Sequence, residues 1–215
     1  MNARAATWTV AGFLDDGRRP GSEFWGFPVL GRIPDAVRFG DAYFVNAVGS
    51  DKSYVRREDV VRSAGMPATR FATLVHPGAS VSGRCVLGSG SYVNGGASVA
   101  GGVSVGSHVH LGSGCVIGHD AVIEDYAVVA PGAVVSGCVR VGRGGYVGAN
   151  ASVRPNVTIG ASALIGMGAV VVRDVDAGTT VVGVPAKPLA SRPVSWISPE
   201  NAVQVLESES THEQR

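Results

Sequence analysis

The sequence of 215 residues predicts a mainly β protein in which a parallel β-helix follows a small α/β domain. Every sixth residue from Val75 to Val171 is Val, Leu or Ile, seventeen positions in succession, and no helix or ordinary strand pairing imposes that period for so long. From position 81 on, the residue two places before each of these aliphatic residues is small or Val, which indicates a second column at a tight corner. The repeat region is therefore a solenoid with an aliphatic interior.

Three hexapeptides complete one triangular coil, so residues 18 apart lie one above the other at about 4.8 Å, the spacing of paired strands. We assign residues 74–190 to this β-helix, of which the aliphatic column spans about five to six coils. Glycine often follows the aliphatic residue directly, as at Gly88, Gly106 and Gly118. Glycine there suits either a turn with a positive φ angle or a close approach of the next coil.

The segment before the solenoid, residues 1–73, alternates predicted strands with predicted helices. Strands are expected at 9–17 and 41–50, a loop and short helix at 27–37, and an amphipathic helix at 51–65. Such alternation predicts an α/β domain with a parallel sheet. A ligand of this domain is expected beyond the carboxyl ends of its strands.

Three residues stand at these predicted strand ends: Asp15, Asp16 and Gly49. They are therefore candidates for substrate binding. The alternative is that the two aspartates only cap and solvate a turn.

The last segment, residues 191–215, is polar and acidic, and we expect a short helix or a frayed tail there. Its packing candidates are Trp196, Ile197 and the stretch from Val203 to Leu206. The N-terminus lacks the pattern of a signal peptide, and no run approaches about 18 apolar residues. We therefore expect a cytoplasmic protein with no membrane partner.

Charge is distributed unevenly along the chain. The net charge of +1 provides no basic field for nucleic acid. Between positions 75 and 171 there are seven charged side chains and no lysine, so water solvates this wall poorly. We expect partner subunits to cover some of its faces.

The three cysteines, Cys85, Cys115 and Cys138, fall in or beside the column of small residues. None forms a CxxC pair, so buried, reduced thiols are expected. No metal is expected, because the cysteines form no cluster with the spacing of metal ligands.

His119 lies two residues after Ile117, outside both inward columns, so its ring should point outward from a corner. Gly137 follows 18 residues later and should stack one coil away, leaving its backbone amide approachable. His108 and His110 flank an inward Val, and they either line the same groove or, as we favour, form hydrogen bonds between subunits.

Four sequence motifs carry a resemblance to a known family: GFLDD at 12–16, AVGS at 47–50, HD at 119–120 and VVVRDVDAGTTVVGVPAKPL at 170–189. Together with the hexapeptide repeats, they make the chain similar to the bacterial sugar O- and N-acyltransferases of the sialic-acid and bacillosamine type. The resemblance covers nearly the whole chain to about residue 190. It implies a left-handed β-helix, a homotrimer, a sugar acceptor and acetyl-CoA as co-substrate.

The resemblance also implies roles for individual residues. His119 would be the general base and Asp120 the carboxylate that orients it, while Gly137 would offer its backbone N–H to the thioester oxygen. The acetyl-CoA contacts would be Val128, Ala149 and Met167, and Lys187 would pair with a CoA phosphate or else remain a solvated lysine. Asp15, Asp16 and Gly49 match the nucleotide-sugar contacts of the family.

The chain departs from the family pattern at three places. Family members begin with a strand and a glycine-rich loop that contains a histidine, whereas this chain begins MNARAATWTVAG. The α/β domain is therefore expected to be truncated, and either the substrate carries no nucleotide or the true start lies upstream of Met1. Gly112 and Ser113 replace a frequent Asn-Thr pair, and Val128 replaces a histidine near the thioester.

Acyl transfer from a thioester needs a base, an oxyanion donor and a dry groove, and the solenoid supplies candidates for each. A zinc carbonic anhydrase on this scaffold would need three converging histidines, and the spacing of the histidines here does not provide them. The sequence therefore predicts an acyltransferase that acts on an amino or hydroxyl group of a sugar or nucleotide-linked sugar. The alternatives are a non-sugar acceptor such as an amino acid, or a non-catalytic solenoid that serves as a structural or binding protein.

Overall fold

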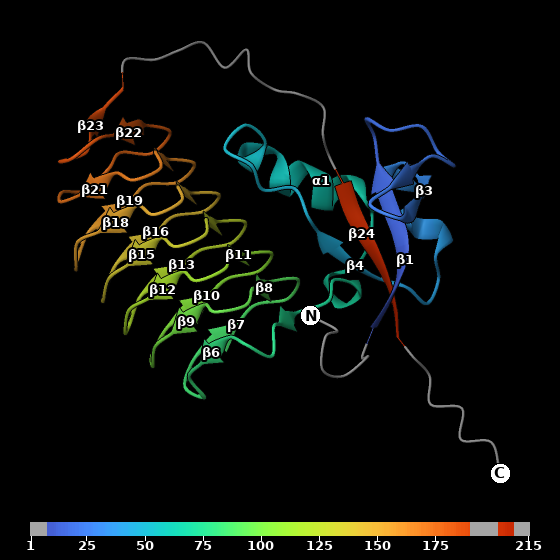
Figure 1. Ribbon diagram of the computed structural model, residues 1–215, viewed down its shortest axis with the longest axis horizontal. Helices are drawn as coiled ribbons and strands as arrows, with labels where there is room; N and C mark the ends of the chain where they lie inside the picture. Colours follow the sequence, from blue (N-terminus) through green and yellow to red (C-terminus); the bar gives the residue numbers. More distant parts are fainter. Residues whose placement is uncertain (1–7, 190–201, 209–215) are drawn as a thin grey trace.

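The computed structural model of the chain describes residues 8–189 and 202–208. It contains a long β-helix and a smaller domain built on a twisted sheet, which lie side by side (Figure 1). No helix among these residues is both long enough and apolar enough to cross a membrane.

The β-helix is built from short strands, almost all of two residues, that stack in parallel as a left-handed solenoid (Figure 1). Its three walls contain β5-β8-β11-β14-β17-β20-β22-β23, β6-β9-β12-β15-β18-β21 and β7-β10-β13-β16-β19, with only β23 running antiparallel to its neighbour. The strand bounds are β5 (Leu74–Val75), β6 (Ser80–Val81), β7 (Val86–Leu87), β8 (Tyr92–Val93), β9 (Ser98–Val99), β10 (Ser104–Val105), β11 (His110–Leu111), β12 (Val116–Ile117), β13 (Val122–Ile123), β14 (Val128–Val129), β15 (Val134–Val135), β16 (Arg140–Val141), β17 (Tyr146–Val147), β18 (Ser152–Val153), β19 (Thr158–Ile159), β20 (Leu164–Ile165), β21 (Val170–Val171), β22 (Thr180–Val182) and β23 (Lys187–Pro188).

The two inward columns predicted from the sequence form one continuous core. From Val93 to Val171 every aliphatic position of the hexad column is at most 3% exposed. The small residues of the second column, such as Ala121 and Ala133, are fully buried beside them. Burial of apolar surface at about 25 cal/mol per Å² makes this column the main stabilising element of the solenoid.

The corners distinguish the two roles that glycine was expected to play. The glycine directly after the aliphatic residue permits close approach: a Cβ atom on Gly118 would lie 2.4 Å from the backbone nitrogen of Gly137 in the next coil. The positive φ angle falls two residues later, at Asp120 (57°) and Cys138 (59°) among others. Asp and Asn tolerate this left-handed conformation better than most residues.

The smaller domain consists of short elements that surround one sheet. Its elements are β1 (Trp8–Asp15), β2 (Glu23–Phe24), β3 (Phe27–Gly31), the 3-10 helix η1 (Ile33–Arg38), β4 (Tyr43–Asn46), the 3-10 helix η2 (Tyr54–Arg56), α1 (Arg57–Ser63) and the 3-10 helix η3 (Ala68–Arg70). The helix expected over 51–65 is therefore shorter than its pattern suggested.

The fifth strand of this sheet comes from the other end of the chain. The strand β24 (Ala202–Ser208) lies between β1 and β4 and runs antiparallel to both, in the sheet order β2-β3-β1-β24-β4 (Figure 1). The expectation of a short helix or frayed tail is wrong for these residues, and the sheet is mixed rather than parallel. Trp196 and Ile197 lie outside the described residues.

The wall that begins with β5 faces the smaller domain, and the contact between them is polar as well as apolar (Figure 1). The Arg57 side chain is fully buried and donates hydrogen bonds to the backbone carbonyls of Val48, His108 and Tyr126. At the edge of the contact, Arg143 forms a two-pronged ion pair with Glu58. The guanidinium of Arg57 therefore joins α1 to two successive coils.

His108 and His110 lie inside this junction, where His110 Nε2 lies 3.0 Å from Asn94 Nδ2 of the same chain. Hydrogen bonds between subunits stay a prediction for these two residues. The ring of His108 stacks on Tyr126 with centroids 5.2 Å apart, and that of His110 stacks on Tyr92 at 4.4 Å. Burial and the nearby Arg57 charge lower the pKa of His108 to about 4 and that of His110 to about 3. Both rings are therefore neutral at physiological pH.

Candidate active site

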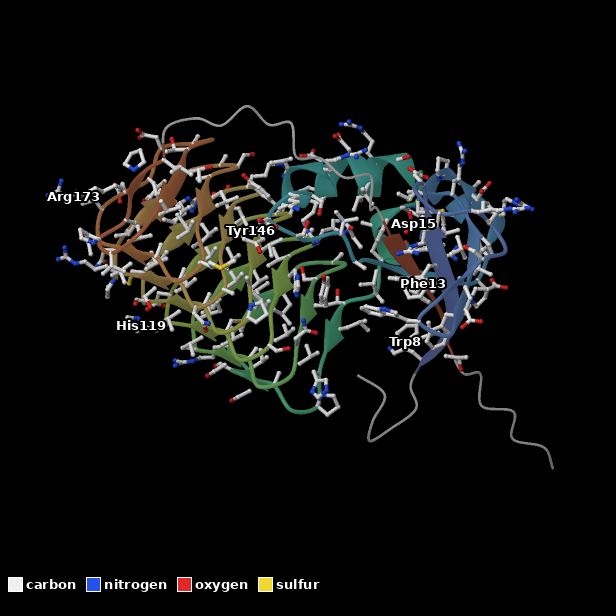
Figure 2. The ribbon with its side chains drawn as sticks, turned by 45° about the horizontal axis from the view of Figure 1, so that its top comes forward. Trp8, Phe13, Asp15, His119, Tyr146 and Arg173 are labelled. Atoms are coloured by element: carbon white, nitrogen blue, oxygen red, sulfur yellow. The ribbon has the colours of Figure 1, made fainter. Side chains whose placement is uncertain are left out.

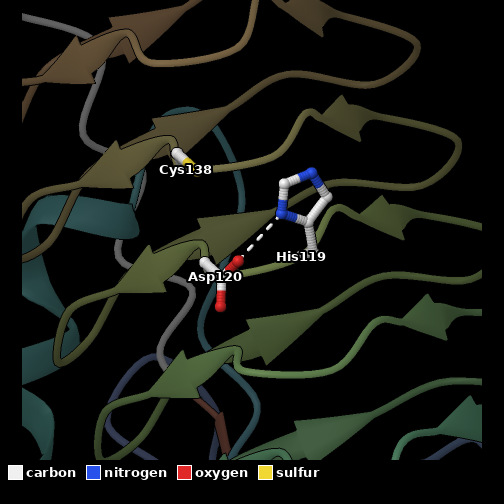
Figure 3. Close-up of side chains that lie close together, drawn as sticks. All are labelled: His119, Asp120 and Cys138. Atoms are coloured by element: carbon white, nitrogen blue, oxygen red, sulfur yellow. Dashed lines mark hydrogen bonds and ion pairs between the residues drawn. The ribbon is translucent and has the colours of Figure 1, made fainter.

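His119 and Asp120 form a hydrogen-bonded pair in the corner between β12 and β13. His119 Nδ1 lies 2.9 Å from Asp120 Oδ2, and the two side chains are 70% and 64% exposed (Figure 3). The ring points outward, as its position in the hexad predicted. With the Nδ1 proton on the carboxylate side, the Nε2 atom has a free lone pair directed away from Asp120.

Gly137 lies directly against the imidazole ring, one coil further along. A Cβ atom on this residue would lie 2.5 Å from His119 Nε2, closer than real Cβ atoms approach other atoms. The backbone holds the two corners together, because the Cys138 N–H donates to the His119 carbonyl at 2.8 Å. Only glycine at position 137 therefore leaves room for the imidazole ring in this position.

Cys138 is exposed, which corrects the expectation that all three thiols are buried. Its Sγ atom lies within 4.8 Å of a ring nitrogen of His119 and of an Asp120 carboxylate oxygen (Figure 3). Sequence spacing would have placed it there, since Cys138 follows Asp120 by the same 18 residues that separate Gly137 from His119. Cys115, by contrast, lies in the core, where burial raises the pKa of its thiol to about 12.

The residues assigned to acetyl-CoA do not gather around this pair within one chain. Val128 is 1% exposed beneath the smaller domain, 3.9 Å from where a Cβ atom of Gly49 would lie. Ala149 and Met167 stack on each other at a different corner, where the Gly168 N–H donates to the Ala149 carbonyl. Met167 is 80% exposed.

Lys187 lies at the far end of the solenoid, on the exposed strand β23. It lines a hollow of about 350 Å³ together with Arg173 and Pro185. Two carboxylates, Asp174 and Asp176, line the same hollow, so its charges balance and it offers no clear preference for a phosphate group.

A pocket of about 390 Å³ opens at the ends of β1 and β4 in the smaller domain. Asp15 and Gly49 line it, together with Arg18, Phe24 and Trp25. Asp15 is buried, accepts the Gly17 N–H at 2.8 Å and pairs with Arg18 at 3.4 Å. Desolvation raises the pKa of its carboxyl group despite these partners.

Asp16 faces away from this pocket. Its carboxylate accepts the Ile33 N–H at 2.9 Å, at the start of η1, and it borders a separate shallow hollow. The alternative interpretation, an aspartate that caps a local structure, describes this contact better than substrate binding does.

The aromatic rim of the pocket was not predicted from the sequence. Trp25 and Gly26, with φ angles of 51° and 79°, form the two-residue turn of the β2–β3 hairpin. The Trp25 ring is 83% exposed and stacks on Phe24 with centroids 4.9 Å apart, and Arg18 lies over the Phe24 ring at 3.9 Å. The aromatic-Gly-aromatic run EFWGFP was the available signal.

The histidine pair and the pocket lie on different sides of one chain. Figure 2 shows His119 on the solenoid and Asp15 at the opposite end of the molecule, in the smaller domain. A single chain therefore does not bring the two sets of residues together.

Comparison with known proteins identifies the scaffold. The family described as bacterial transferase hexapeptide (six repeats) matches residues 102–137. The acetyltransferase domain of PglB from Neisseria gonorrhoeae FA1090 is similar, with 31% identity, a TM-score of 0.70, and coverage of 82% of this chain and 85% of that one. No curated protein matches the sequence.

Two further solved structures are similar to the chain. A mutant of perosamine N-acetyltransferase from Caulobacter crescentus, in complex with CoA and GDP-perosamine, has 29% identity, a TM-score of 0.70 and coverage of 82% of each chain. WeeI from Acinetobacter baumannii AYE has 27% identity, a TM-score of 0.63, and coverage of 83% of this chain and 85% of that one. The chain thus belongs to the hexapeptide-repeat sugar acyltransferases, enzymes that draw their acyl group from a coenzyme A thioester.

Proposed function

We propose that the chain transfers an acetyl group from acetyl-CoA to the amino group of a nucleotide-linked sugar, with His119 as general base. The observation that carries this proposal is the His119–Asp120 pair at 2.9 Å, with the ring against Gly137. The similar PglB domain has been solved in complex with acetyl coenzyme A, and the similar perosamine N-acetyltransferase with CoA and GDP-perosamine. These complexes support the same donor and the same class of acceptor here.

The arrangement suits proton removal from an attacking amine. Asp120 accepts the Nδ1 proton and fixes the tautomer, so Nε2 takes the proton as the amine nitrogen bonds to the thioester carbon. In this proposal the Gly137 N–H donates to the thioester oxygen as it gains negative charge. The carbon–sulfur bond then breaks, and the CoA sulfur takes the proton held on His119 Nε2 and leaves as the thiol, which restores the base.

The pocket of the smaller domain suits the nucleotide part of the acceptor. Trp25 and Phe24 form an exposed aromatic surface on which a base can stack, and the Arg18 guanidinium lies beside it. Lys52 also lines this pocket. Two cations next to an aromatic surface fit a base that is joined to phosphate.

A second chain completes the site in this proposal. The histidine pair, the stacked Ala149 and Met167, and the pocket around Asp15 lie on separate surfaces, and a homotrimer would place surfaces of neighbouring chains together. Light scattering should give three chains per particle. A monomer with full activity would show that this assembly is unnecessary.

The proposed function is tested by mass spectrometry of acceptors incubated with acetyl-CoA. The panel should contain nucleotide-linked amino sugars, the same sugars without nucleotide, and amino acids, and acetylation is expected for the first class only. His119→Ala should lower kcat by roughly 10²–10⁴, with the acetyl-CoA Kd changed by no more than a few-fold. His76→Ala, a histidine at the start of the solenoid, is the control and should keep normal activity. Equal losses in both variants would remove His119 from its role as base.

A further inference from the structure

We propose that His119, Asp120 and Cys138 form a binding site for a soft divalent cation such as Zn²⁺, and that the bound ion inhibits the enzyme. The inhibitory part rests on the proposed role of His119, whereas the binding part stands on geometry alone. Three different donor atoms meet at one point of the solenoid surface: a ring nitrogen of His119, an Asp120 carboxylate oxygen and Cys138 Sγ, all within 4.8 Å of one another (Figure 3). We take Nδ1 as the ligand nitrogen, because it is the one that faces Asp120.

The solenoid fixes this convergence through its backbone. Asp120 and Cys138 occupy equivalent corner positions of successive coils, with φ angles of 57° and 59°. The Cys138 N–H donates to the His119 carbonyl at 2.8 Å, so the two corners are bonded to each other. The three side chains therefore start from a rigid base and converge outward, where they are exposed to an ion from solution.

The distances suit a small tetrahedral ion. Zn²⁺ bonds of about 2.0–2.3 Å to nitrogen, oxygen and sulfur hold neighbouring ligand atoms about 3.3–3.8 Å apart. His119 Nδ1 and Asp120 Oδ2 are 2.9 Å apart, with a proton between them that a metal ion would replace. The sulfur atom needs to move on the order of 1 Å, which an exposed side chain achieves by a small rotation.

The donor set selects the class of ion. A thiolate and an imidazole favour Zn²⁺ and similar soft cations over Mg²⁺ and Ca²⁺, which prefer oxygen ligands. Three protein ligands leave a fourth position for water. Binding releases the thiol proton, so the affinity should fall as the pH is lowered.

An ion at this position would disable the base. A neutral imidazole carries one proton, and when Nδ1 gives its lone pair to the metal, that proton resides on Nε2. Nε2 is then a hydrogen-bond donor and has no lone pair with which to accept the proton of the amine. Asp120, now a metal ligand, no longer fixes the useful tautomer.

Cobalt(II) titration of the purified enzyme, with Co²⁺ as a coloured substitute for Zn²⁺, tests the binding site directly. A thiolate-to-cobalt charge-transfer band and the visible bands of a four-coordinate ion are expected at one ion per chain. Cys138→Ser should abolish the charge-transfer band and weaken Zn²⁺ binding in calorimetry at least tenfold. Cys85→Ser is the control, a partly buried cysteine of the same solenoid that lies outside the cluster, and it should leave both unchanged. The proposed site is wrong if the wild-type protein shows no charge-transfer band, or if Cys138→Ser and Cys85→Ser change the band and the Zn²⁺ affinity equally.

Acetylation assays with added ZnCl₂ then test the inhibition. Zn²⁺ should stop turnover by the wild-type enzyme, a chelator should restore it, and Cys138→Ser should keep its basal rate and resist the ion. Inhibition that is equal in Cys138→Ser, or a wild-type enzyme that binds Zn²⁺ without losing activity, overturns the inhibitory role. If no acceptor is acetylated at all, the proposed function fails, while the cobalt spectrum still decides the metal site.

Discussion

Replacing Gly137 with alanine should slow catalysis about 100-fold without unfolding the solenoid. The new Cβ atom would lie 2.5 Å from His119 Nε2, whereas ordinary contact begins at 3.4 Å, so the ring must move by about 0.9 Å. A misplacement of about 1 Å costs on the order of 10²-fold in rate, or about 2.7 kcal/mol of transition-state stabilisation. The ring is exposed and free to move away, so the fold should not resist the substitution.

Steady-state kinetics and thermal unfolding measure the two effects separately. Gly83→Ala is the matched control, because Gly83 occupies the same corner three coils earlier, and a Cβ atom there would meet nothing within 4 Å. Alanine keeps the backbone N–H at position 137, so a loss in kcat reports the placement of the ring and not a missing donor. Wild-type kcat in Gly137→Ala would refute the assignment of His119, and an equal drop in Tm for both variants would refute the claim that the solenoid tolerates the change.

Three further predictions concern the smaller domain and its junction with the solenoid. Truncation after Leu189 should abolish acceptor binding while acetyl-CoA still binds, because β1 and β4 both pair with β24. A chain truncated after Ser208 is the control and should bind both ligands in calorimetry. Acceptor binding by the shorter chain would contradict the role of β24. Trp25→Ala should raise the acceptor KM roughly tenfold if a base stacks there, and an equal change in Val37→Ala, an exposed residue outside the pocket, would count against stacking. The free energy of unfolding should fall as the pH drops from 6.5 to about 4, because His108 and His110 take up protons in the unfolded chain but stay neutral in the folded one. A free energy that does not change with pH in denaturant titrations would show that these rings are not buried.

The solenoid was predictable because its signal is local and repeated. The same pattern recurs in seventeen successive hexads, and each of them has an aliphatic residue at the inward position. The outward position of His119 and its contact with Gly137 follow from the same arithmetic, since the coil contains 18 residues. The neighbourhood of Cys138 follows equally well, although its position just before an inward valine suggested burial.

The smaller domain was predicted less well because its partners are distant in the sequence. Residues 202–208 lie within the polar, acidic segment 191–215, yet they supply the strand between β1 and β4. His108 and His110 gave no sign of the domain that covers them, because the buried Arg57 that meets their wall lies about 50 residues earlier. The Trp25 rim depends on a hairpin whose strand β2 has only two residues.

The sequence by itself determined the β-helix, its inward columns and the corner that holds His119, Asp120 and Gly137, because a fixed period leaves the backbone one way to bury its aliphatic residues. The tertiary structure decided where the ends of the chain meet, which wall of the solenoid is covered and which aspartate lines the pocket. These features depend on pairings between segments that share no period. Their energies come from backbone ladders and buried polar contacts, which form only once both partners have been brought together.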